Sequence, residues 1–140
     1  MSERGVRGVL LGHGDMAFGM VDAVRHITGC DAAALTPLSN RGLSPEALCD
    51  EVAGRIGDGP AILFTDLQSG SCGFTARRLC QSVEGLAVIS GVNLPLLIDF
   101  VMHRDEPLEI LVPRLLATGR AGICCAPAHL GEHERPAVSR

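Results

Sequence analysis

The sequence predicts an α/β domain with a mainly parallel four-stranded sheet and helices on both faces. Short apolar runs alternate with helical patterns along its 140 residues, and strands joined through helices form parallel sheets with right-handed crossovers. The runs Val6–Leu11, Ala61–Thr65 and Leu86–Ser90 are largely apolar, which is typical of strands buried on both faces. We therefore expect three layers with the common strand order 2-1-3-4, which makes the first and third strands neighbours.

The first half of the chain predicts two strands, each followed by a helix. After the first strand, a helix that Asp15 can cap continues to Gly29. Asp31–Thr36 is a weaker second strand that we expect Pro37 to end, and residues 38–43 form a polar loop. The next helix has Ser44 as its N-cap and Pro45 as its first residue, and it ends at residues 57–59.

The second half repeats this alternation. The third strand delivers Asp66 at its end, and a loop over Leu67–Gly73 leads to a helix over Phe74–Val83. After the fourth strand, GVNLP precedes helices over Leu96–His103 and Leu108–Thr118. Ala121–Ala126 is a candidate short fifth strand. We therefore assign residues 1–126 to one domain and residues 127–140, which have no apolar face, to a mobile C-terminal tail.

Composition excludes several classes of protein. The net charge of −4 argues against a general nucleic-acid binder, and aromatic residues make up only 3% of the chain, too few for base stacking. No apolar run reaches the roughly 18 residues of a membrane span, and the N-terminus does not resemble a signal peptide. The 6 cysteines lack CxxC spacing. We expect a cytoplasmic protein with reduced thiols.

His13 is the strongest candidate for a functional residue. It follows the first strand, and Asp66 follows the third, so the predicted strand order brings them together at the carboxyl edge of the sheet. Ligands of open α/β sheets bind at this edge. A carboxylate hydrogen-bonded to one imidazole nitrogen fixes the tautomer and leaves the lone pair of the other nitrogen free. That nitrogen could attack phosphorus and form a phosphohistidine.

A phosphoryl group on His13 would need hydrogen-bond donors. Ser69, Gly70 and Ser71 precede a predicted helix and offer hydroxyl and amide groups, and Gly14 offers an amide at another helix. Ser71 is as well suited to capping the helix at Phe74 as to binding phosphate. Asp15 would repel phosphate unless it points away as a helix cap.

Two other chemistries remain open at this stage. Cys72 and Arg78 have the C-x5-R spacing of cysteine phosphatases, and a helix N-terminus would lower the pKa of the Cys72 thiol. The residues between them are poor in the glycines that a phosphate cradle needs. His13, Asp66 and Cys72 could instead bind a metal ion, although no compact ligand spacing supports this and we predict no metal.

Three segments resemble the IIA component of the mannose/fructose/sorbose class of the bacterial sugar phosphotransferase system. They are GVLLGHGDMAFGMVDAVRHITG, ILFTDLQSGS and VISGVNLPLLIDFV, in this order, and the resemblance extends from Val6 to Ala126. It implies that His13 accepts phosphate from the carrier protein HPr and passes it to a IIB partner, without a cofactor. It also implies that Asp66 orients the imidazole and that Ser71 helps to hold the phosphoryl group.

The resemblance further implies a homodimer that reaches the membrane only through IIC and IID components. The C-terminal fifth strand, here Ala121–Ala126, would be antiparallel and exchanged between subunits, covering an open sheet edge. The chain departs from the family pattern in one loop, where TDLFGGSP is replaced by TDLQSGSC. This change leaves a second interpretation open, in which the chain is a stand-alone regulatory phosphoprotein of the same fold that is not coupled to sugar transport.

Overall fold

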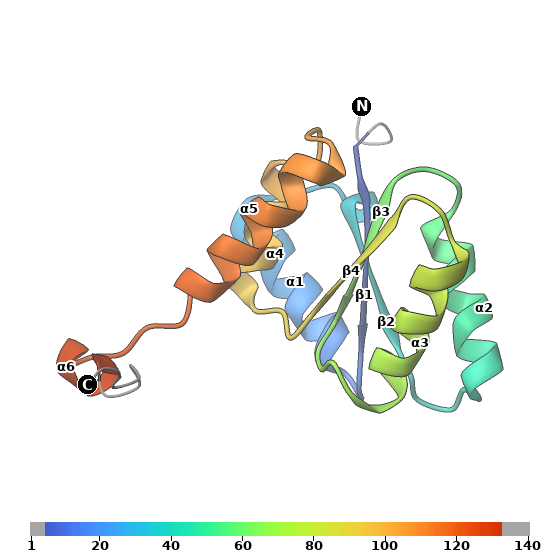
Figure 1. Ribbon diagram of the computed structural model, residues 1–140, viewed down its shortest axis with the longest axis horizontal. Helices are drawn as coiled ribbons and strands as arrows, with labels where there is room; N and C mark the ends of the chain where they lie inside the picture. The colour runs from blue at the N-terminus through green and yellow to red at the C-terminus, as the bar shows by residue number, and fades with distance from the viewer. Residues whose placement is uncertain (1–4, 133–140) are drawn as a thin grey trace.

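The computed structural model describes residues 5–132 and confirms the predicted α/β architecture. Four parallel strands in the order β2-β1-β3-β4 form one sheet between two layers of helices (Figure 1). The elements in chain order are β1 (Arg7–Gly12), α1 (Met16–Thr28), the 3-10 helix η2 (Ala32–Ala34), β2 (Leu35–Ser39), α2 (Pro45–Ile56), β3 (Ala61–Thr65), α3 (Gly70–Ser82), β4 (Leu86–Ser90), α4 (Leu94–Met102), α5 (Leu108–Ala121) and α6 (Ala128–Gly131).

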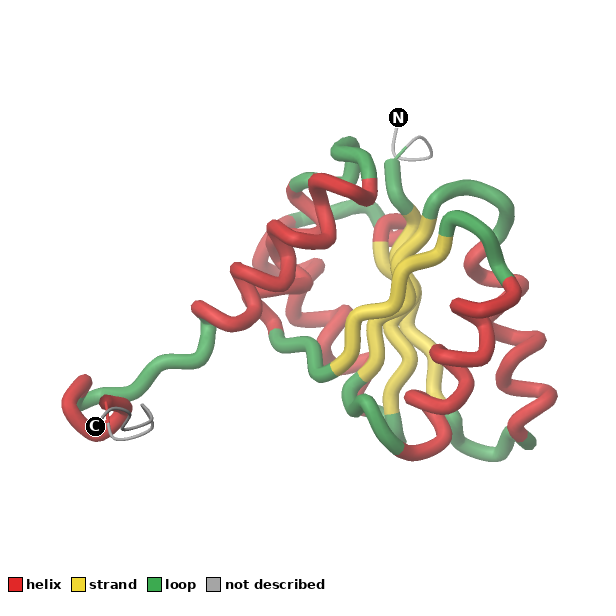
Figure 2. Tube along the Cα trace, in the orientation of Figure 1, coloured by secondary structure: helices red, strands yellow, loops and turns green. Residues whose placement is uncertain are grey.

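The sheet separates two hydrophobic cores. Helices α1, α4 and α5 cover one face and α2 and α3 cover the other (Figure 2). Successive residues of β1 contribute to opposite cores, with Leu10 on the α1 side and Val9 and Leu11 on the α2 side. On the α1 side, the rings of Phe64 and Phe100 meet edge to face with their centroids 5.0 Å apart. This packing fixes the strands whose ends carry the candidate site.

The second strand differs from the prediction. It begins at Leu35 and continues through Pro37 to Ser39, while residues 32–34 form a 3-10 turn. Because β2 lies at the edge of the sheet and pairs only with β1, a proline whose missing N–H would face away from β1 is tolerated there. The polar loop predicted for residues 38–43 is therefore shorter and begins at Asn40.

Residues 121–126 form no strand in the single chain, so the fifth strand exchanged between subunits stays a prediction. Helix α5 continues to Ala121, and the Gly122 N–H still donates a helical hydrogen bond to the Thr118 carbonyl. Residues 122–127 belong to no strand and lead away from the sheet to the short helix α6 (Figure 1). The predicted mobile tail thus contains a helix at Ala128–Gly131, and its residues 133–140 lie outside the described part. Within residues 5–132, no helix has the length and apolar character needed to cross a membrane.

Candidate functional site

The strand order brings His13 and Asp66 together, as the sequence predicts. Leu11 of β1 lies opposite Thr65 of β3 in the parallel register, so the residues that follow both strands emerge side by side. The Nδ1 atom of His13 lies 2.9 Å from Asp66 Oδ2, and the backbone N–H of His13 donates to the same oxygen at 2.8 Å. Two residues 53 positions apart in the sequence therefore form one hydrogen-bonded unit.

Asp66 is suited to remain ionised. Its second oxygen, Oδ1, accepts a hydrogen bond from the Leu67 N–H at 2.9 Å, and its side chain is only 7% exposed. Burial raises the pKa of Asp66, but the hydrogen bonds and charge of His13 and the hydrogen bond from Leu67 outweigh burial, so the pKa lies below its ordinary value. An ionised carboxylate can only accept hydrogen bonds, so Nδ1 of His13 carries the proton.

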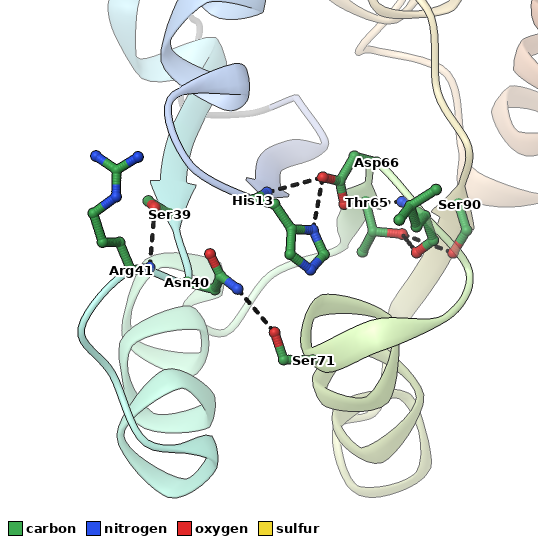
Figure 3. Close-up of polar contacts among 9 residues, drawn as sticks. His13, Ser39, Asn40, Arg41, Thr65, Asp66, Ser71 and Ser90 are labelled. Carbon is green, nitrogen blue, oxygen red and sulfur yellow. Dashed lines mark hydrogen bonds and ion pairs between the residues drawn. The ribbon is translucent and has the colours of Figure 1, made fainter.

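The other ring nitrogen of His13, Nε2, has no hydrogen-bond partner among residues 5–132. It faces away from Asp66, towards the start of α3 (Figure 3), and the side chain is 40% exposed. Gly70 lies against this nitrogen, since a Cβ atom at that position would be 3.3 Å from Nε2. Gly70 also has a φ angle of +81°, which other residues rarely adopt. Nε2 therefore presents its lone pair to a surface where the backbone comes close.

Helix α3 begins at Gly70, four residues before the predicted start at Phe74. Ser71 therefore lies inside the first turn and does not cap the helix at Phe74, which corrects that part of the prediction. Ser69 occupies the N-cap position, but its side chain makes no capping hydrogen bond. The first N–H groups of α3 remain available for an anion, because the first turn of a helix lacks internal acceptors for them.

Two residues not singled out from the sequence shape the loop before α3. A Cβ atom at Gly73 would overlap the Gln68 carbonyl, so only glycine lets the loop pack this closely. Arg77 donates to the same carbonyl at 2.6 Å from one turn further along the helix. Neither a glycine at the end of a predicted loop nor an arginine in a predicted helix signals this role in the sequence.

The loop after β2 contributes a further residue, which no pattern in the sequence indicates. Asn40 donates a hydrogen bond from Nδ2 to Ser71 Oγ at 2.9 Å, on the side of His13 opposite Asp66 (Figure 3). The next residue, Arg41, forms an ion pair with Asp15 at 3.0 Å. Asp15 makes no capping hydrogen bond, contrary to the prediction, and its charge is paired with Arg41 instead. Gly14, with a φ angle of +60°, turns the chain between His13 and this pair.

Cys72 fits neither alternative chemistry well. Its side chain is fully buried, and burial, followed by the negative charge of Asp66, raises the pKa of the thiol to about 11. The expectation of a lowered pKa, on which the phosphatase interpretation depends, is therefore wrong. Ligand atoms of His13, Asp66 and Cys72 do lie within 4.8 Å of one another. Both oxygens of Asp66 already accept hydrogen bonds, however, and the thiol is strongly protonated, so the cluster fits a hydrogen-bonded pair better than a metal site.

The chain matches the family model described as "PTS system fructose IIA component" over residues 8–110, a range that includes His13, Asp66 and Ser71. The chain belongs to this family. Membership implies a phosphoryl-transfer role in the sugar phosphotransferase system, as a phosphocarrier component and not as a conventional enzyme.

Individual relatives agree with this assignment. The chain is 33% identical over 78 residues to the PTS system mannose-specific EIIAB component of Escherichia coli K12; the match covers 54% of this chain and 24% of that protein, so the chain spans about a quarter of its length. Two solved IIA structures share the fold. The EIIA component from Streptococcus agalactiae has a TM-score of 0.79 at 21% identity, covering 86% of this chain and 96% of that one. The mannose/sorbose-specific IIA subunit from Enterococcus faecalis has a TM-score of 0.74 at 22% identity, covering 96% and 99%.

Proposed function

We propose that this IIA chain is a phosphoryl carrier that accepts the phosphoryl group of phospho-HPr on His13 and passes it to a IIB partner. One observation carries this proposal: Asp66 holds the protonated Nδ1 of His13 at 2.9 Å, which leaves the lone pair of Nε2 exposed at the start of α3. A neutral imidazole with a fixed tautomer is the form that attacks phosphorus. Its open position suits a donor that is itself a protein.

The transfer exchanges one phosphorus–nitrogen bond for another. The lone pair of Nε2 attacks phosphorus in line, while the bond from phosphorus to the donor histidine breaks and its electron pair returns to the donor ring. The His13 ring keeps its proton on Nδ1 and gains positive charge, which the carboxylate of Asp66 stabilises. Since the phosphoryl group arrives on an activated nitrogen, the step requires neither a nucleotide nor a metal ion. Transfer to IIB follows the same in-line geometry in reverse: an acceptor on IIB attacks phosphorus, and the bond from phosphorus to Nε2 of His13 breaks.

The groups that we propose to bind the phosphoryl oxygens come from the start of α3 and from the turn after His13. They are the hydroxyl of Ser71, the backbone N–H groups of Ser69, Gly70 and Ser71 at the start of α3, and the backbone of Gly14 at the turn after His13. Preorganised donors of this kind stabilise the negative charge on the equatorial oxygens of the transferred group.

Radioactive labelling tests the carrier function. Incubation with labelled phosphoenolpyruvate, enzyme I and HPr is expected to give a phosphoprotein that is labile in acid and stable in base, and His13→Ala is expected to abolish the label. His103→Ala is the matched control, because His103 also contacts an aspartate but lies at the end of α4. Unlabelled wild-type protein with a cognate HPr would contradict the proposal. A chain that is labelled but passes nothing to any IIB partner would favour the regulatory phosphoprotein.

We also propose that the functional unit is a homodimer in which residues 122–131 of each chain contact the β4 edge of the other. Within the described part of the chain, β4 pairs only with β3, and an open strand edge favours pairing with another chain. Ile123, at the start of the segment that leads away from the body, is 79% exposed. Light scattering is expected to give the mass of two chains for the wild type and of one for Ile123→Asp. A monomeric wild type would contradict the dimer without affecting the carrier function.

A further inference from the structure

We infer that Asn40 is a positioning residue for phosphoryl transfer, which acts by making the Ser71 hydroxyl a donor to the group on His13. The inference rests on the proposed carrier function and extends it to a loop that lies outside the strand ends bearing His13 and Asp66. Asn40 is the first residue after β2, and its side chain reaches across to the first turn of α3.

Backbone contacts fix Asn40 relative to His13. The N–H of Asn40 donates to the carbonyl of Gly12 at 3.2 Å, one residue before His13. Its side-chain Nδ2 donates to Ser71 Oγ at 2.9 Å. Asn40 therefore joins the end of β1 to the start of α3, and the free Nε2 of His13 faces the side on which this hydrogen bond lies (Figure 3).

The direction of this hydrogen bond determines what Ser71 can do. A serine hydroxyl has one proton to donate and two lone pairs that accept. Because Oγ accepts a hydrogen bond from Asn40, the hydroxyl proton is directed to another acceptor. A phosphoryl group on Nε2 would place three strong acceptor oxygens in this region. Asn40 thus selects the orientation in which Ser71 donates to phosphate.

The substitution Asn40→Asp separates this role from simple space filling. Aspartate has nearly the same shape as asparagine but only accepts hydrogen bonds, so it would draw the Ser71 proton towards itself and add negative charge beside the phosphoryl group. Asn40→Ala would remove the orienting donor without reversing it. Asn40 is half-buried and belongs to neither hydrophobic core, so neither change disturbs a buried core.

Two phosphoryl donors are needed in the experiment. Phosphoramidate phosphorylates histidine directly and needs no protein contact, whereas phospho-HPr must dock. With phosphoramidate, we expect Ser71→Ala and Asn40→Ala each to slow the phosphorylation of His13 by about tenfold, and Asn40→Asp by more, as expected for losing one hydrogen bond to a charged group. The Asn40→Ala/Ser71→Ala double variant should be no slower than Ser71→Ala, because both changes remove the same donor.

The matched control is Ser44→Ala in the same loop. Ser44 accepts a hydrogen bond from the Ala47 N–H and caps α2, so this change loosens the loop without touching Ser71, and its rate should equal that of the wild type. A wild-type rate for Asn40→Ala with phosphoramidate, or effects that multiply in the double variant, would overturn the inference. Wild type that reacts with phosphoramidate but not with phospho-HPr would refute the carrier function alone, and the same cycle would still decide the role of Asn40. A His13 that resists both donors would overturn both.

Discussion

Two histidines, His13 and His103, contact a largely buried aspartate through Nδ1, and they illustrate different uses of one interaction. His13 lies 2.9 Å from Asp66, and His103 lies 2.8 Å from Asp99. The exposures are similar, 40% and 34% for the histidines and 7% and 11% for the aspartates. Distance and burial therefore do not distinguish the pair at the sheet edge from the pair at the end of α4.

The difference lies in the other partners of each carboxylate. Asp99 also accepts hydrogen bonds from Arg114 Nε at 3.0 Å and from Thr118 Oγ1 at 2.6 Å, both on α5, so it fastens α4 to α5. The other partners of Asp66 are backbone N–H groups of His13 and Leu67, and the charge of its carboxylate is left to one imidazole. A carboxylate shared with an arginine stabilises a contact between helices. A carboxylate that pairs with a single imidazole can fix the tautomer of that ring and stabilise its positive charge.

The largest expected effect comes from neutralising each aspartate in turn. Asp66→Asn presents an amide to Nδ1, which allows the wrong tautomer of His13, and we expect labelling by phospho-HPr to slow by roughly a hundredfold or more. Asp99→Asn should leave the labelling rate within about twofold of the wild type while lowering the free energy of unfolding by about 1–3 kcal/mol. Initial labelling rates and urea denaturation of both variants test this. Equal losses of labelling would show that the two pairs do not differ in function.

The sequence was sufficient to predict the Asp66 pair but not the Asn40 contact. Apolar runs alternating with helices favour the common strand order 2-1-3-4, and in that order the parallel strands place His13 beside Asp66. The N–H of Asn40 reaches the Gly12 carbonyl because β2 continues through Pro37 to Ser39. A proline is tolerated there because β2 lies at the edge of the sheet. A prediction that ends the strand at Thr36 places Asn40 within a loop of unknown path.

The start of α3 could not be predicted either, because it also depends on contacts between residues outside the local pattern. The residues Gly70 to Gly73 have weak helix propensity, and contacts of the Gln68 carbonyl with Arg77 and Gly73 hold the first turn in place. The exchanged fifth strand is a different case. Strand pairing of residues 121–126 would require a second chain, and the properties of a single chain do not supply that partner.

The next largest effect on labelling is expected from a pair of glycine substitutions. They test whether the close approach of the Gly70 backbone to Nε2 of His13 matters for phosphorylation. Gly70 and Gly85 have φ angles of +81° and +78°, so alanine strains both positions alike and should cost each variant about 1 kcal/mol of stability. Only at Gly70 does the added Cβ meet His13, since nothing lies within 4 Å at Gly85. We expect labelling to fall by about tenfold for Gly70→Ala and to stay unchanged for Gly85→Ala. Equal labelling of the two variants at equal stability would contradict the close approach.

The smallest effect concerns acid stability, where the two pairs should behave alike. Burial raises the pKa of both Asp66 and Asp99, but hydrogen bonds and nearby charges outweigh it, so both folded pKa values lie below the ordinary value of 3.8. Each carboxylate therefore stabilises the folded state fully above that value, and the contribution is lost as the pH falls through the folded pKa, because the unfolded chain takes up protons first.

Urea denaturation at pH values between about 5 and 2 measures this contribution. In the wild type, stability should fall with decreasing pH below about 4, and either Asp66→Asn or Asp99→Asn should make the decline less steep. An unchanged slope for one variant would mean that its carboxylate titrates alike in the folded and unfolded states. Acid stability depends on the ionisation of the carboxylate, whereas labelling depends on the free Nε2. Similar slopes of stability against pH for the two variants, combined with unequal labelling rates, would therefore show that the two pairs share their electrostatics but differ in function.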